Sequence, residues 1–170
     1  LAGAIRSYDL SSKFWNSYDR PLYMKASLLI GLVKPAAHEE GNMEKRRDFY
    51  IQASEYLQRA EKLNPYRPQI YMTRALLEEA NGSEMNVVGG AFEKALKVDP
   101  LFLQSRTEYG RYLAQSGQSP KALTVLEEGM VYTYSETDNA LISYYHLTSI
   151  LRRQMGDEGG AMVLEQKIAI

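Results

Sequence analysis

The sequence contains no cysteine, no long apolar run and no marked excess of charge of either sign. Without cysteine, the chain has no disulfide, no thiol nucleophile and no cysteine-ligated zinc site. It also has no run of 18 or more apolar residues, so we expect no segment of this chain to insert into a membrane. The 20 Lys and Arg residues nearly balance the 21 Asp and Glu residues. Proteins that bind nucleic acids usually carry a basic excess or stripe, so the balance argues against that class.

Motifs for catalysis and for binding a cofactor or metal ion are missing as well. His38 and His146 show no paired-ligand spacing, whereas a metal site needs three or four convergent ligands. No Gly-x-Ser-x-Gly motif marks a serine nucleophile. The glycine-rich residues 156–160 lack the Lys-Ser/Thr pair that contacts phosphate and magnesium. The sequence therefore predicts a protein that is not an enzyme and that binds no cofactor and no metal ion.

Several short clusters have ordinary structural explanations. The paired carboxylates at 78–79 and 127–128 are expected on solvated helix faces. The basic residues at 45–47 and 152–153 could touch phosphate or lipid headgroups, but short charge runs are usually solvated helix faces. The triplet at 81–83, Asn-Gly-Ser, fits a glycosylation acceptor, a pattern that often arises by chance. None of these clusters predicts a function by itself.

What the sequence does contain is a pattern that recurs about every 34 residues. Each copy combines small residues, an apolar residue in the second helix and, in most copies, a closing Pro. The clearest copy comprises Tyr109, Gly110, Gly117, Ala122, Leu126 and Gly129. Two further copies comprise Ala53, Leu57, Ala60 and Pro65, and Gly82, Phe92, Ala95 and Pro100. Such a period predicts a stack of helical hairpins, which presents a surface instead of housing a chemical step.

The hairpin around residue 117 illustrates the local rules. We expect Gly117 to end the first helix in the left-handed conformation, which costs other residues energy. Ser119 is then expected to cap the second helix, with Pro120 at its first position, where no backbone donor is needed. Gly110 and Gly129 are expected to be small because the two helices cross closely there.

We predict one domain over residues 1–170. Its parts are a partial repeat helix at 1–16, a repeat at 20–65 with an inserted loop at 34–46, repeats at 66–100 and 103–134, and an irregular terminal repeat at 137–168. The inserted loop is either a tolerated surface loop or a functional one. The chain begins at Leu1 without Met, so we expect it to be part of a longer protein. Both ends are apolar and lack a polar capping helix. Further residues, another chain or a second copy in a homo-oligomer would cover them.

The repeated residues resemble tetratricopeptide repeats (TPR). The stretch from Phe92 to Pro100 is similar to the closing stretch of a TPR unit, and so is Asn64-Pro65. The departures from the family pattern are Ile30 and Glu78 in place of an aromatic residue, Val88 in place of Ala, and Tyr134 in place of Pro. The resemblance implies an all-α fold, a right-handed superhelical stack of antiparallel helical hairpins whose first helices line a concave groove.

The resemblance also implies which side chains project into that groove, through the helical period. They are Met24, Leu28, Gln69, Met72, Leu76, Gln104, Thr107, Arg111, Leu141 and Tyr145, with Glu79, Ala114 and Thr148 at further positions. These residues suit an extended or helical peptide with apolar anchors and one acidic group near Arg111. Alternatively, Met24, Leu28 and Leu76 belong to the core between repeats. Glu108 would repel the acidic chaperone tails that some TPR modules bind.

Two functions follow from these resemblances. The first is a protein-interaction scaffold that binds a protein or peptide segment in the concave groove. The second rests on a weaker resemblance to the soluble C-terminal TPR region of bacterial membrane-bound O-antigen polymerases and ligases. It implies a membrane-embedded portion of the same protein that carries the active residues, and it favours a periplasmic over a cytoplasmic location. The identity of the partner does not follow from either resemblance.

Overall fold

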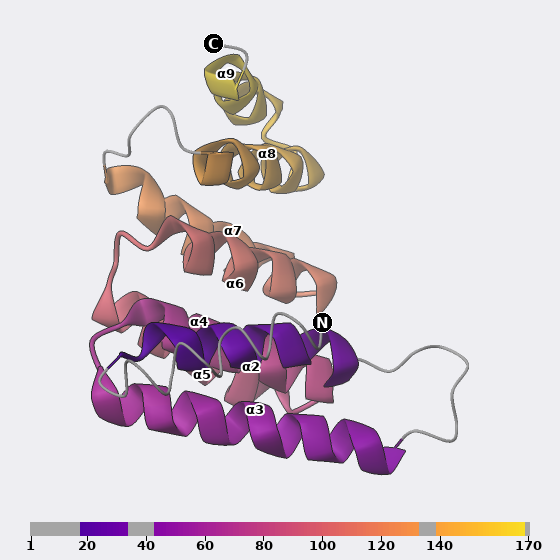
Figure 1. Ribbon diagram of the computed structural model, residues 1–170. Coiled ribbons are helices and arrows are strands. Elements are labelled where there is room, and N and C mark those ends of the chain that lie inside the picture. The colour runs from indigo at the N-terminus through magenta and orange to yellow at the C-terminus, as the bar shows by residue number, and fades with distance from the viewer. Residues whose placement is uncertain (1–17, 34–42, 133–138, 169–170) are drawn as a thin grey trace. The chain divides into compact units, whose positions relative to one another are not determined.

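The computed structural model describes residues 18–33, 43–132 and 139–168, and these residues form helices joined by turns (Figure 1). They comprise eight α-helices and one short 3₁₀-helix, and no β-strand occurs in these three ranges. The all-α prediction is therefore confirmed for the described part of the chain. The predicted partial helix at 1–16 and residues 34–42 of the predicted loop lie outside the described residues.

The chain divides into two compact units, residues 1–98 and 99–170, which are described separately. The described residues of the first unit form the helices α2 (Arg20–Val33), α3 (Met43–Leu63), α4 (Pro68–Asn81) and α5 (Met85–Val98). Helices α2 and α3 form one hairpin and α4 and α5 a second, and α4 packs against both α2 and α3 (Figure 1). Small or apolar side chains that are fully buried fill this contact; among them are Ala26, Ala53, Leu57 and Ala60.

Helix α3 begins earlier than the sequence pattern predicts. We expected a loop up to Arg46, but residues 43–46 are helical. Glu44 lies in the first turn, where its negative charge interacts favourably with the helix dipole. The Arg46 Nε donates to the carbonyl of Val33 at 2.8 Å, which joins the start of α3 to the end of α2. The charged composition that suggested a loop therefore belongs to an exposed first turn of a helix.

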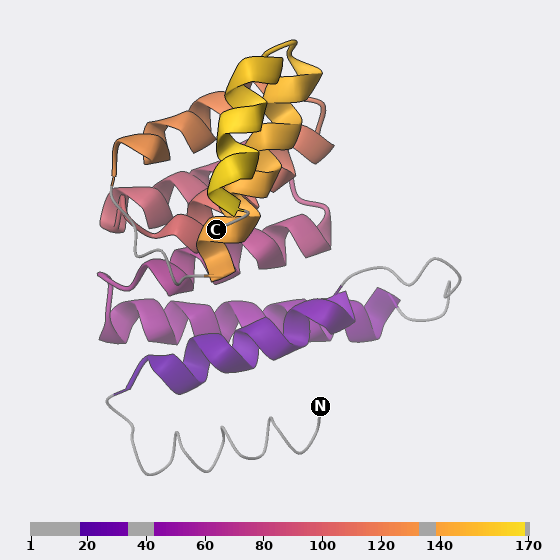
Figure 2. The ribbon, with the colours of Figure 1, turned by 90° about the horizontal axis from the view of Figure 1, so that it is seen from above.

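The second unit has the same hairpin organisation. It holds α6 (Leu103–Gln115), α7 (Ser119–Glu127), the 3₁₀-helix η2 (Glu128–Val131), α8 (Asn139–Gln154) and α9 (Glu158–Ile168). Helix α6 pairs with α7 and α8 pairs with α9, and α8 packs against both α6 and α7. Figure 2 shows α8 and α9 lying side by side at the yellow end of the chain.

Glycines in the left-handed conformation turn the chain between paired helices. Gly82, Gly117 and Gly156 have φ angles of 74°, 77° and 87°, so the predicted turn at Gly117 is confirmed. The predicted cap is wrong by one residue. Gln118 is the N-cap residue, Ser119 is already helical, and no side chain caps α7. Pro120 still lies in the first turn, where its missing N–H costs no helical hydrogen bond.

The predicted close crossing of α6 and α7 is confirmed at Gly110. A Cβ on Gly110 would lie 2.8 Å from Leu126 Cγ, and Leu126 is fully buried. Gly129 is equally crowded, by the side chains of Arg106 and Tyr144. Glycine at both positions therefore lets neighbouring helices approach each other closely.

Candidate interaction groove

An open hollow of about 380 Å³ lies between α6 and α8 in the second unit. Both are the first helices of their hairpins. The side chains that line the hollow are Gln104, Thr107 and Glu108 from α6, and Ala140 and Ser143 from α8. The hollow is thus a short groove between two first helices.

The residue types on α8 explain why the two helices leave space between them. Leu103 on α6 and Leu141 and Tyr144 on α8 are buried, and α6 and α8 are in contact. The part of α8 that faces the hollow carries only small side chains, those of Ala140 and Ser143. Large buried residues therefore hold the helices together while the small ones leave an opening at the surface.

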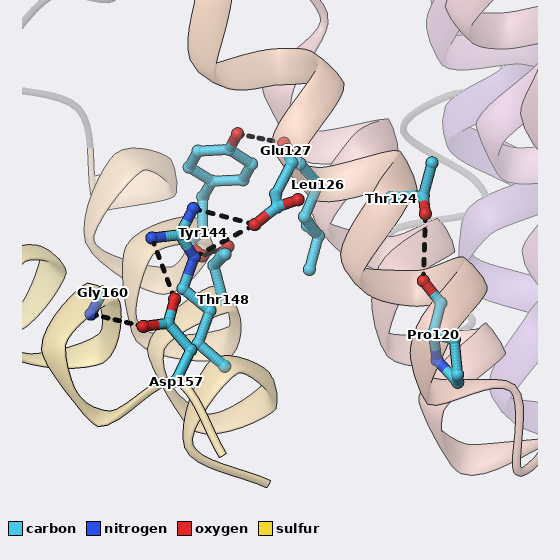
Figure 3. A network of polar contacts seen from close by, with 9 residues as sticks. Pro120, Thr124, Leu126, Glu127, Tyr144, Thr148, Asp157 and Gly160 are labelled. Atoms are coloured by element: carbon cyan, nitrogen blue, oxygen red, sulfur yellow. Dashed lines mark hydrogen bonds and ion pairs between the residues drawn. The ribbon is translucent and has the colours of Figure 1, made fainter. Parts of the chain in front are cut away.

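Two polar side chains from α6 and α8 fix the end of α7. The Tyr144 hydroxyl on α8 donates to the carbonyl of Leu126 (Figure 3). The Arg106 guanidinium on α6 donates to the carbonyl of Val125 at 2.6 Å and to that of Pro100 at 3.2 Å. Val125 and Leu126 lie in the last turn of α7, where the regular hydrogen bonds of the helix come to an end. These bonds position α8 against the α6–α7 hairpin and so fix the width of the groove.

A charge network at the other end of α8 strengthens the same packing. Arg152 contacts Glu127 of α7 at 2.8 Å and Asp157, in the α8–α9 turn, at 3.6 Å. Figure 3 shows Glu127 and Asp157 pointing toward the same space. Of the clusters expected on solvated helix faces, Arg152 is thus partly buried in an ion pair, whereas the side chain of its partner Glu127 is 42% exposed. Arg153 is also paired, with Glu158 and Glu165.

Glu78 in the first unit departs from the expected solvated position too. Its carboxylate accepts hydrogen bonds from the Tyr50 hydroxyl at 3.0 Å and from the Ser83 hydroxyl at 2.6 Å. Burial, followed by the hydrogen bond to Glu78 and the negative charge of Glu78, raises the pKa of Tyr50. Glu78 therefore joins α3 to the α4–α5 turn, at a position where the repeat pattern prefers an aromatic residue.

Within the groove, the hydrogen bonds of α6 determine which groups face a ligand. The Thr107 hydroxyl donates to the carbonyl of Leu103 at 3.0 Å. Arg111 Nε donates to the Glu108 carboxylate at 2.8 Å, and Arg111 Nη1 donates to the Gln115 side chain at 2.5 Å. Arg111 is thus held along the surface of its own helix, and it is not among the residues that line the hollow.

Only some of the predicted groove residues of the second unit line the hollow. Gln104 and Thr107 line the hollow, whereas Leu141 is buried and the Tyr145 ring lies 5.3 Å from the Lys167 ammonium. On α8 the lining residues precede the predicted ones by one or two positions, because Leu141 and Tyr144 face the core. Glu108, which the sequence placed at the groove as a residue that would repel an acidic tail, also lines the hollow, one helical turn after Gln104. That spacing puts both side chains on the same face of α6.

In the first unit, the predicted groove residues are more buried than those of α6. Met72 is buried, and four others are half-buried: Met24, Leu28, Gln69 and Leu76. Met24, Leu28 and Leu76 lie outside the core cluster that joins α2, α3 and α4. A role for any of the predicted residues in binding stays a prediction.

No known protein-family model matches the sequence, and a search of curated proteins finds no significant match. None of the described helices is long and apolar enough to cross a membrane. Across the three described ranges, no group of three or more His, Asp or Glu side chains lies close enough together to hold a metal ion. The candidate site therefore rests on the geometry of α6 and α8.

Proposed function

We propose that this chain is a non-catalytic protein-interaction scaffold of the TPR type. A segment of a partner protein docks in the groove between the first helices α6 and α8. The observation that supports the proposal is the 380 Å³ hollow between these helices, lined in part by Gln104 and Thr107, two of the residues at the predicted groove positions. In each unit, moreover, the first helix of one hairpin packs against the first helix of the next, as α2 does against α4 and α6 against α8.

The chemistry of the groove suits a peptide better than a flat protein surface. Its volume lies in the usual range for sites that enclose a compact group, about 300 to 1,000 Å³. Gln104 and Ser143 carry side chains that can both donate and accept hydrogen bonds to a peptide backbone. Because they project from helices that are packed together, their spacing is largely fixed before binding, which reduces the entropy lost on association.

The proposal can be tested by selecting peptides from a random display library with the purified chain. We expect enriched peptides to bind the unaltered chain and to lose binding to the Ser143→Leu variant, because a leucine would fill the hollow. His146→Leu is the matched control. It adds the same side chain to an exposed position of α8, one turn further on and outside the hollow.

The two variants distinguish specific binding in the groove from non-specific binding elsewhere on the surface. Peptides that bind the unaltered chain and His146→Leu but not Ser143→Leu would support the proposal. The absence of any enriched peptide, or equal binding to Ser143→Leu, would refute it. Circular dichroism of both variants checks that α8 remains helical.

A further inference from the structure

The hydrogen-bonding groups that line the hollow are weighted toward acceptors. The Thr107 hydroxyl uses its single proton in the bond to Leu103, so toward the hollow it can only accept. The ionised carboxylate of Glu108 has no proton to donate. Gln104 and Ser143 can act in either sense. A ligand group rich in donors therefore matches these residues better than a group rich in acceptors.

The charge of the hollow points in the same direction. Among the five described residues that line the hollow, Glu108 is the only one with a charged side chain. The nearby cation, Arg111, is bonded to Glu108 and to Gln115 on its own helix and does not line the hollow. A carboxylate offers about four lone-pair positions, so the bond from Arg111 leaves Glu108 able to accept from a second donor.

We propose that the hollow takes an arginine side chain of the partner segment, with its guanidinium donating to Glu108 and Thr107. This inference rests on the proposed function and names the anchor that the groove recognises. A guanidinium presents five donors in a planar fork that matches a carboxylate. The small side chains of Ala140 and Ser143 leave room for that plane on the α8 side. The anchor side chain of the partner segment is then basic. This differs from the sequence-based expectation of a partner with an acidic group near Arg111.

The direct test uses small probes and so does not need the natural partner. The chain is labelled with ¹⁵N and titrated with N-acetylarginine amide, with the neutral, nearly isosteric N-acetylcitrulline amide, and with N-acetylglutamate amide. We expect the arginine probe to shift the backbone amides of residues 104–108 and 140–143. The citrulline probe should bind about fivefold more weakly, and the glutamate probe should leave these amides unchanged.

Three variants assign the effect to Glu108. Glu108→Gln should weaken the arginine probe about fivefold without unfolding the chain, because a part-exposed pair such as Glu108–Arg111 contributes little stability. Arg111→Gln should strengthen the arginine probe, since it removes the competing cation. Glu55→Gln, at an exposed position of α3 in the first unit, is the matched control and should change nothing.

The outcomes distinguish this inference from the proposed function. Equal binding of the arginine and citrulline probes, or shifts caused by the glutamate probe, would overturn the arginine anchor. Display-selected peptides that require an open Ser143 position but contain no basic residue would also overturn it, and they would leave the scaffold function supported. If no peptide is selected while the arginine probe still binds through Glu108, the scaffold function fails and the arginine site stands.

Discussion

Gly110 and Leu126 lie so close together that a Cβ on Gly110 would be 2.8 Å from Leu126 Cγ. Leu126 is fully buried, so it has little room to move away. We expect Gly110→Ala to lower the free energy of unfolding by about 1 to 3 kcal/mol through overpacking. This loss outweighs the gain of about 1 kcal/mol that alanine normally gives inside a helix. Urea denaturation followed by circular dichroism measures the difference.

Gly90 is the matched control for that substitution. It lies on the exposed side of α5, and nothing comes within 4 Å of the position its Cβ would occupy. Gly90→Ala should therefore raise the free energy of unfolding by about 0.5 to 1 kcal/mol. The same substitution at two helical glycines is thus expected to have opposite signs. If both variants changed the free energy of unfolding in the same direction, the close crossing of α6 and α7 at Gly110 would be contradicted.

The hydroxyl of Tyr144 should contribute measurably to stability. Tyr144→Phe keeps the buried ring but leaves the Leu126 carbonyl without the bond it now accepts. We expect a loss of about 0.5 to 1.5 kcal/mol, the usual net contribution of one hydrogen bond, because the backbone N–H of Glu128 still reaches the Leu126 carbonyl. Tyr66 is 83% exposed, so Tyr66→Phe should change stability by less than about 0.5 kcal/mol. Equal melting temperatures for the two variants would argue against the bond.

Acid should weaken the ion pairs of Glu61. This carboxylate on α3 contacts Arg74 at 2.9 Å and Lys94 at 2.7 Å. Burial raises the pKa of Glu61, but the hydrogen bond from Lys94 and the charges of Arg74 and Lys94 outweigh it, so the pKa is lowered overall. A lowered pKa stabilises the folded state above the unfolded pKa of about 4.5, and the effect is lost as the pH falls through the folded pKa.

The comparison of the unaltered chain with Glu61→Gln isolates this contribution. At about pH 7 the variant should be less stable by up to about 1 kcal/mol. At a pH below the folded pKa the difference should shrink toward zero, because the carboxylate is then largely protonated. The free energy of unfolding at both pH values is the measurement. A difference that does not change with pH would show that Glu61 acts through packing instead of charge.

Alkali should destabilise the first unit through Tyr50. Its pKa is raised, first by burial and then by Glu78, so the stabilisation is fully present below about pH 10 and is lost as the pH rises through the folded pKa. Tyr50→Phe cannot ionise, so it should lose less stability than the unaltered chain between about pH 8 and about pH 11. If both proteins lost the same stability over that interval, the Tyr50 hydroxyl would not be part of the alkaline transition.

Features that depend on a short stretch of chain could be predicted from the sequence. The turn at Gly117 follows from the need for a positive φ between two helices. The crossing at Gly110 follows from a small residue at a repeated position. The start of α3 differs from the prediction because the charged residues at 44–46 suggested a loop, although none of them breaks a helix. Composition was the misleading signal there, since an exposed first turn and a loop look alike.

Pairings between distant side chains could not be predicted in the same way. Arg106 donates to carbonyls at positions 100 and 125, and Arg152 reaches back to Glu127, so their partners depend on how the hairpins pack. The groove shows the same division. The helical period placed Gln104 and Thr107 at the hollow, but the face of α8 depended on which residues the core takes, and it takes Leu141. Repeat spacing predicts where the helices lie in the sequence, whereas packing determines which face of each helix turns toward the core.

The end of α7 has a consequence for how the second unit unfolds. Its last carbonyls are bonded from two sides, by Arg106 of the preceding helix and by Tyr144 of the following hairpin. Fraying of α8 and α9 alone would break the bond from Tyr144 to the Leu126 carbonyl and would expose the crowded contact at Gly129 to solvent. The two hairpins of this unit should consequently unfold together as one cooperative unit, instead of one repeat at a time. Their amide hydrogens should then exchange at a shared rate.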